Sequence, residues 1–189
     1  MGDQETTGAR GPAVQDLLRA PNVEAFLLTG DGVFPNNRTL PLLVYHKALN
    51  PDAPDLISQV QRLLAENGWV GAWVDRVFDF HHYHSRSHEV LAICSGRADL
   101  CFGGEHGIKL TLAAGDVVVI PAGVAHKNLG ASNDFVVVGA YPQGQENYDM
   151  CRGRREERQE TDKKIVSTPI PESDPLYGRD GPLPEHWPV

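Results

Sequence analysis

The sequence predicts an all-β fold, a single jelly-roll barrel, from the spacing of its apolar residues. Between residues 73 and 141, short apolar runs are separated by glycine or proline turns, which is typical of a jelly-roll. Residues 117–120 are apolar at every position, so this strand is expected to be buried on both faces. Gly139 stands inside the last apolar run, where another group is expected to approach the backbone closely. A chain of 189 residues without an internal repeat is expected to form one domain.

Residues 22–150 are assigned to the barrel, and the polar start, residues 1–21, is expected to be flexible. One segment near residues 54–67 has a helical rather than a strand period, and Gly68 stands where such a helix is expected to end. Its apolar stripe consists of Ile57, Val60, Leu63 and Leu64. A single amphipathic helix must bury this stripe, so we expect it to pack on the outside of the barrel.

The composition changes after the barrel, over residues 151–189. This segment is rich in proline, yet several residues are too apolar for a plain linker: Ile165, Val166, Ile170, Leu176, Tyr177 and Trp187. We expect an extended C-terminal tail that packs on the barrel or on a partner subunit. Such a tail, together with extra strands before the barrel that would leave exposed edges, predicts a homodimer.

The candidate site centres on a histidine-rich segment in front of an apolar strand. In a β-strand alternate side chains share a face, so Phe78, Phe80, His82 and His84 are expected to point the same way. This predicts that Phe78 and Phe80 form a substrate pocket beside the two imidazoles. Glu89 can return beside them, and His126 follows a second turn-bounded apolar run. Three imidazoles and one carboxylate suit a first-row divalent metal.

His88 competes with Glu89 for the place in the site. The two residues are adjacent, so both cannot point inward from one strand without a bulge. Glu89 is preferred because a carboxylate would neutralise part of the charge of the cation.

These residues resemble the two motifs of the cupin superfamily. His82-x-His84, four residues, Glu89, six residues and Gly96 match the first motif; Gly115, five residues, Pro121-x-Gly123, two residues and His126 match the second. The resemblance implies a metal inside a small barrel, held by His82, His84, Glu89 and His126, and it also selects Glu89 over His88. The chain departs from the pattern at Arg76 and Gly130, where glycine and asparagine are expected.

Other stretches resemble the YjlB-like subgroup of single-domain cupins. They are Phe34-Pro35-Asn36-Asn37, Asn67-Gly68-Trp69, the run 126–132 and Val138-Gly139-Ala140-Tyr141-Pro142. This resemblance supports the fold and the metal, and it does not choose a reaction.

Charge and cysteine content narrow the partners and the compartment. With 17 basic and 25 acidic residues the net charge is -8, which argues against nucleic acid or an anionic membrane as the main partner. The three cysteines form no CxxC motif, which favours core packing in a reducing, cytoplasmic environment. No apolar run is long enough to cross a bilayer.

The predicted function is that of a mononuclear metal-dependent enzyme acting on a small, partly apolar, oxygen-bearing molecule. Fe2+ is favoured, with Mn2+, Ni2+ or Zn2+ as alternatives, and Glu89 is the candidate catalytic residue as well as a ligand. Dioxygenase-type oxidation is favoured over isomerase, epimerase or decarboxylase chemistry. A non-catalytic module that binds a small molecule is the alternative class.

Overall fold

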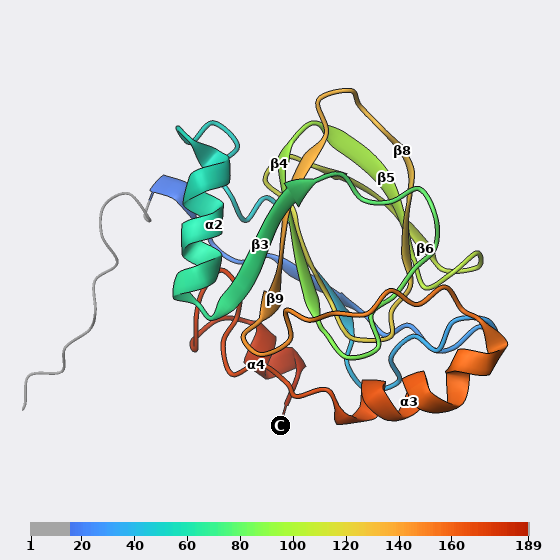
Figure 1. Cartoon of the computed structure of the whole chain (residues 1–189). Coiled ribbons are helices and arrows are strands. Elements are labelled where there is room, and N and C mark those ends of the chain that lie inside the picture. Colours follow the sequence, from blue (N-terminus) through green and yellow to red (C-terminus); the bar gives the residue numbers. More distant parts are fainter. Residues whose placement is uncertain (1–15, 189) are drawn as a thin grey trace, which may run out of the picture.

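A computed structural model describes residues 16–188, and the expected flexibility of residues 1–15 lies outside the described part. Most elements are strands, with few helices (Figure 1). In chain order they are β1 (Val23–Phe26), β2 (Leu42–Tyr45), α2 (Leu56–Glu66), β3 (Trp69–Asp75), β4 (Glu89–Ser95), β5 (Arg97–Phe102), β6 (Ile108–Ala113), β7 (Val117–Ile120), β8 (His126–Ala131), β9 (Val136–Pro142), the 3-10 helix η1 (Arg155–Glu157), α3 (Arg158–Ser167) and α4 (Leu183–His186).

The strands form two antiparallel sheets. One has six strands in the order β1-β2-β7-β4-β9-β3, and the other has three in the order β6-β5-β8. Side chains of both sheets meet in one apolar core, to which β4 contributes Leu91 and Ile93 and β5 contributes Leu100 and Phe102. This is consistent with a jelly-roll, but the predicted barrel is not closed, because the two sheets are joined by packed side chains rather than by a continuous hydrogen-bonded ladder.

The six-stranded sheet is covered on both faces, as expected from its uniformly apolar strands. Leu91 and Val118 face the smaller sheet, whereas Val90 and Val119 face a second core on the other side. This alternation follows directly from the period of two in a strand. Strands β4 and β7 are therefore buried on both faces. Strand β4 begins at Glu89, the residue on which the site depends.

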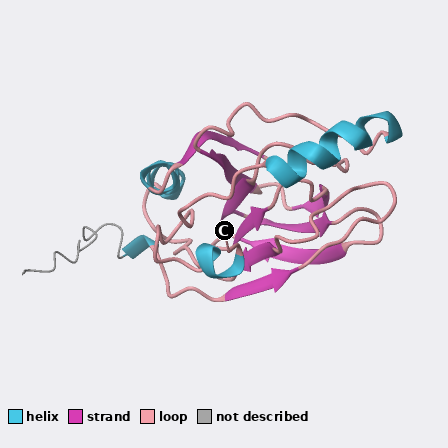
Figure 2. Cartoon of the chain, turned by 90° about the horizontal axis from the view of Figure 1, so that it is seen from below, coloured by secondary structure: helices cyan, strands magenta, loops and turns pink. Residues whose placement is uncertain are grey.

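Helix α2 covers part of this second core. Its bounds fall within residues 54–67, the segment in which the helical period predicted a helix. Val60, Leu63 and Leu64 are buried against the sheet, and Gly68 follows the helix with a φ of 79°. A positive φ at this place ends a helix readily because glycine has no Cβ. Figure 2 shows the helices around the outside of the strands.

The C-terminal segment packs on the sheet of its own chain. Leu176, Leu183 and Trp187 are fully buried in the same core as α2. The expectation of an extended tail is wrong for residues 158–167, which form α3. The sequence of this helix has no apolar stripe from which it could be predicted. Ion pairs one turn apart, such as Glu160 with Lys164 (2.6 Å), stabilise it instead.

Three smaller expectations can be compared with the structure. Leu17, inside the segment expected to be flexible, is buried in the core, and Leu18 bridges to Leu49. The three cysteines are free and buried, in line with core packing. Within residues 16–188, no helix has the length and apolar character needed to span a membrane.

Buried tyrosines predict a loss of stability in alkali. Burial raises the pKa of Tyr83 to about 12, and it raises the pKa values of Tyr45 and Tyr141 still further above their usual range. In the unfolded chain these phenols lose their protons near pH 10, so above that pH unfolding releases protons and stability falls. Each group contributes about 1.4 kcal/mol per pH unit until its folded-state pKa is reached.

Chemical denaturation at pH 9.0, 10.5 and 11.5 measures this slope. A Tyr45→Phe variant should lose stability with rising pH less steeply than the wild type, since one of the titrating phenols is gone. Equal free energies of unfolding at the three pH values would contradict the prediction.

Candidate metal centre

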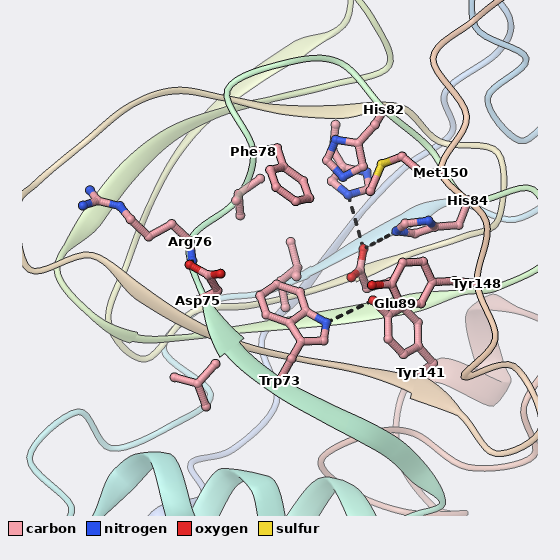
Figure 3. Close-up of a pocket in the computed structure, with 14 residues that line it drawn as sticks. Trp73, Asp75, Arg76, Phe78, His82, His84, Glu89, Tyr141, Tyr148 and Met150 are labelled. Atoms are coloured by element: carbon pink, nitrogen blue, oxygen red, sulfur yellow. Dashed lines mark hydrogen bonds and ion pairs between the residues drawn. The ribbon is translucent and has the colours of Figure 1, made fainter.

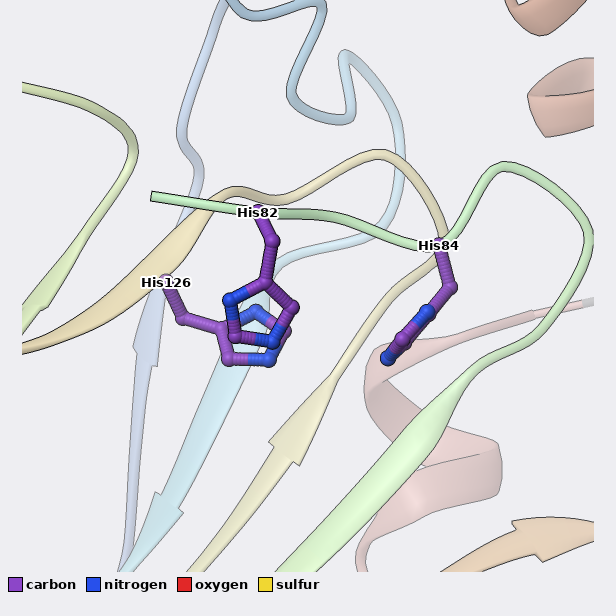
Figure 4. Close-up of side chains that lie close together, drawn as sticks. All are labelled: His82, His84 and His126. Carbon is purple, nitrogen blue, oxygen red and sulfur yellow. The ribbon is translucent and has the colours of Figure 1, made fainter. Parts of the chain in front are cut away.

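Three buried histidines converge at one point of the fold. His82 and His84 lie in the connection between β3 and β4, and His126 is the first residue of β8. His82 and His126 pair through their backbones, with N···O distances of 3.2 and 2.9 Å. One side-chain nitrogen of each of the three histidines lies within 4.8 Å of those of the others. Figure 4 shows the three rings turned toward a common point.

The other ring nitrogen of each histidine is held by a backbone carbonyl. Nδ1 of His82 lies 3.1 Å from the Phe80 oxygen, and Nδ1 of His126 lies 3.2 Å from the Val124 oxygen. Nδ1 of His84 contacts the Asp149 oxygen. A carbonyl can only accept, so each Nδ1 carries the proton and donates it. Each Nε2 is then left with a free lone pair, which is the arrangement of metal-binding imidazoles.

Glu89 places a carboxylate among these nitrogens. Its Oε2 lies 3.3 Å from Nε2 of His84 and 3.2 Å from Nε2 of His126. Neither contact has the angles of a hydrogen bond, so Oε2 is a buried acceptor without a hydrogen-bond donor. Acceptor atoms that face one another, rather than donors, fit a cation between them.

His88 immediately precedes β4, and its side chain points to the opposite side of the sheet from Glu89. Its Nδ1 accepts a hydrogen bond from the Ala122 N–H (2.9 Å), and its ring packs 4.8 Å from that of Trp187. Burial lowers its pKa to about 3, so it is a neutral core residue. The structure therefore brings together His82, His84, Glu89 and His126, the residues predicted from the sequence, and leaves His88 outside the cluster.

The charges of the cluster also suit a cation. Burial, together with the neighbouring His126, lowers the pKa of His82 to about 3, so its lone pair is available at neutral pH. Burial alone would raise the pKa of Glu89, but His84 and His126 outweigh it and hold that carboxyl ionised. Burial alone would lower the pKa of His84, but the charge of Glu89 outweighs it and raises that pKa. A metal bound at Nε2 of His84 would be attracted by the same carboxylate charge that raises this pKa.

A cavity of about 210 Å³ opens onto this cluster (Figure 3). It is lined by Trp73, Val74, Asp75, Arg76, Val77, Phe78, His82, His84, Glu89, Leu91, His126, Tyr141, Tyr148 and Met150. Much of this wall is aromatic or aliphatic, which favours a ligand with an apolar part. All four predicted metal ligands border the cavity.

Of the predicted pocket pair Phe78 and Phe80, only Phe78 lies at the cavity. Phe78 lines the cavity, although half of it is exposed. Phe80 does not: its ring stacks on Phe78 from outside at 4.9 Å, and the Arg152 guanidinium covers it at 3.8 Å. The alternation assumed from a strand fails here because residues 76–81 belong to no strand.

Sequence reasoning missed the tyrosine next to Glu89. The Tyr141 hydroxyl accepts a hydrogen bond from Trp73 Nε1 (3.0 Å) and directs its own hydrogen to Glu89 at the wall of the cavity. The Trp73 indole reaches this position because residue 139 is glycine; a Cβ there would collide with the ring. The close approach expected at Gly139 is thereby confirmed. Gly139 and Tyr141 share one face of β9, because they are two residues apart in a strand. This spacing could have identified Tyr141 from the sequence.

Comparison with known proteins places the chain among cupins. Residues 75–138 match the sequence model of the cupin domain. The chain is 42% identical over 164 residues to the uncharacterized protein YjlB of Bacillus subtilis (strain 168), a match that covers 87% of this chain and 96% of that protein.

Three solved structures show a distant likeness to the chain. An acireductone dioxygenase from Bacillus anthracis with a cadmium ion is 19% identical, with a TM-score of 0.36 over 47% of this chain and 60% of that chain. A double-stranded β-helix protein from Klebsiella pneumoniae is 17% identical, with a TM-score of 0.35 over 82% and 100% of the two chains. The DMSP lyase DddQ from Ruegeria pomeroyi is 17% identical, with a TM-score of 0.32 over 77% and 57%. These likenesses carry no argument about function. The identity to YjlB over nearly the full length of both chains does show the family: the chain belongs to the YjlB-like single-domain cupins.

Proposed function

We propose that the protein is a mononuclear metal-dependent enzyme that acts on a small, partly apolar, oxygen-bearing organic molecule. One observation carries the proposal: the buried Oε2 of Glu89 has no hydrogen-bond donor, although two imidazole Nε2 atoms lie within 3.3 Å of it. His82, His84, His126 and Glu89 would hold a first-row divalent ion. Three nitrogens and one carboxylate oxygen suit Fe2+, which we favour, and also Mn2+, Ni2+ or Zn2+.

The remaining chemistry is divided between the metal and the chain. A bound metal would supply Lewis acidity or, as Fe2+, activation of dioxygen. Burial and the charge of Glu89 keep the pKa of Tyr141 above its usual range, so this phenol stays protonated and directs its hydrogen bond to Glu89, where a substrate oxygen would compete for it. Trp73 fixes the direction of that hydrogen bond by donating to the same oxygen. Glu89 is both a ligand and the candidate base.

The lining of the cavity limits the class of substrate. Trp73, Phe78 and Leu91 offer apolar contact. Arg76 is the one lysine or arginine among the described lining residues, but its guanidinium donates to the Ser132 carbonyl (2.7 Å) and points away from the cavity in Figure 3. A phosphate would therefore find no basic side chain, whereas a molecule with one or two oxygens for the metal and an apolar remainder fits.

Metal analysis and an activity panel test the proposal. Purified protein should contain about one divalent metal per chain, and the Fe2+ form should consume oxygen with one of a panel of phenols, 1,3-diketones and hydroxy acids. Turnover without oxygen consumption would indicate isomerase, epimerase or decarboxylase chemistry. Ligand binding without turnover would indicate the non-catalytic class, and a metal-free protein with an intact fold would refute the proposal.

Phe78 provides a test of the cavity that leaves the metal in place. Phe78→Ala should weaken binding of the best panel compound about tenfold, because a large apolar contact is lost. Metal content should stay unchanged, because Phe78 supplies no ligand atom and its ring only packs edge-on, 5.4 Å from that of His82. Val166→Ala is the matched control, because Val166 is 88% exposed and lies on α3. Unchanged binding in the Phe78 variant would place the substrate elsewhere.

The homodimer stays a prediction. Light scattering at micromolar concentration tests it, and a monomeric mass would refute it.

A further inference from the structure

We propose that residues 145–151 form a clasp that holds the metal-binding segment in place, with Asp149 as the positioning residue for His84. The inference rests on the proposed metal site. It concerns a part of the chain that lies beyond residues 75–138, the range that matches the cupin domain.

The clasp is needed because the segment with the histidines is not a regular strand. Residues 76–88 have only isolated bridges, at His82 and Tyr83. A strand ladder would fix the direction of each side chain, but here that support is missing. The two ends of the segment are held by β3 and β4, which leaves its middle to be fixed by other contacts.

Residues 145–151 tie this segment at three levels. Tyr83 and Cys151 exchange two backbone hydrogen bonds, of 3.0 and 2.9 Å. The Asp149 carboxylate accepts from the Ser85 N–H (2.7 Å) and from the Ser85 hydroxyl (2.6 Å). Gln145 accepts from the Ser87 hydroxyl (2.6 Å) at its carbonyl and from the His88 N–H (2.9 Å) at its side chain.

Asp149 is the member of the clasp that touches a proposed ligand. Its backbone carbonyl contacts Nδ1 of His84, and its side chain is locked onto the buried Ser85, the next residue. The hydrogen bonds of the Asp149 side chain therefore hold the backbone carbonyl of Asp149 in place. This carbonyl in turn orients the imidazole of His84. Partners of this kind set the tautomer and the direction of a ligand, and their loss weakens metal binding by about 10–100-fold.

The same clasp forms part of the cavity wall. Tyr148 and Met150, on either side of Asp149, both line the cavity, and the Tyr148 ring lies 4.8 Å from that of His84. Figure 3 shows Tyr148 and Met150 beside His84. The position of Asp149 therefore affects both the metal ligand and the shape of the space where substrate would bind.

Metal titration of the chelator-treated full chain tests the role of Asp149. Asp149→Ala should raise the Kd for Co2+ about 10–100-fold, whereas Asp149→Asn, which keeps an acceptor for Ser85, should recover much of the affinity. Ser85→Ala should fall between them. The visible spectrum of the Co2+-saturated Asp149→Ala protein should also differ from that of the wild type, because the His84 imidazole is no longer held in one direction. Glu146→Ala, in the same segment but exposed, is the matched control.

The outcomes separate this inference from the proposed function. A wild-type protein that takes up no Co2+ overturns both. Normal uptake by the wild type, with an equal Kd and spectrum for Asp149→Ala, overturns the inference alone. A lower melting temperature of the metal-free variant with an unchanged Kd would show a structural role only and would also overturn it. If Asp149→Ala fails to fold, Ser85→Ala decides by the same two readouts.

Discussion

His126→Ala is expected to abolish stoichiometric metal binding, with a Kd raised more than about 100-fold, the upper end of what loss of an outer-shell partner costs. The substitution removes one of the nitrogens around Oε2 of Glu89, 3.2 Å away, and opens a buried space to water. It also removes a ring that helps to hold the Glu89 carboxyl ionised. Elemental analysis of the protein after dialysis against trace-metal-free buffer measures the loss.

A second histidine variant serves as the control. His106→Ala changes an exposed residue in the loop between β5 and β6, so its metal content should match that of the wild type. Excess metal should raise the melting temperature of the wild type and of His106→Ala, since a ligand that binds only the folded state stabilises it. It should not raise that of His126→Ala. One metal per chain in the His126→Ala protein would contradict the assignment.

Three ligands, His82, His84 and Glu89, could be predicted from sequence because their relationships are local, whereas His126 was identified by its place in the second cupin-like motif. His82 and His84 are two residues apart, and this spacing keeps both on one side even in a segment that is not a regular strand. Glu89 begins a true strand, so period two correctly separates it from His88. Phe80 was misplaced because it lies outside any strand. Without a strand ladder, the alternation of side chains cannot be extended from His84 back to Phe80.

The rest of the site depends on contacts between distant parts of the chain. Asp149 meets Ser85 across 64 positions, and Trp73 meets Tyr141 across 68 positions. No local pattern encodes such a pairing. Gly139 predicted a close approach to the backbone, but the glycine does not identify the side chain that approaches it. Helix α3 was missed because its charged pairs, rather than an apolar stripe, distinguish it.

The C-terminal segment is anchored by one buried carboxylate, and the largest expected loss of stability follows from removing it. Asp174 is fully buried and accepts four hydrogen bonds, two of them from the Tyr45 hydroxyl (2.6 Å) and the Leu183 N–H (3.1 Å). The other two come from the N–H groups of Leu176 (2.8 Å) and Tyr177 (2.9 Å). These bonds join the end of the chain to β2 and keep Trp187 against His88, behind Glu89.

Asp174→Ala is therefore expected to lower the free energy of unfolding by about 4 kcal/mol or more, because buried donors left without an acceptor cost about 1–3 kcal/mol each. For a chain of this size the melting temperature should fall by about 10 °C. Asp174→Asn, which keeps one good acceptor oxygen, should lose less. Asp180→Ala, an exposed aspartate of the same segment, should change stability by under about 0.5 kcal/mol. Chemical denaturation of the metal-free proteins separates this effect from metal binding. Equal stabilities for Asp174→Ala and Asp180→Ala would mean that the tail contributes little to the fold, and that Trp187 is not needed behind the strand that carries Glu89.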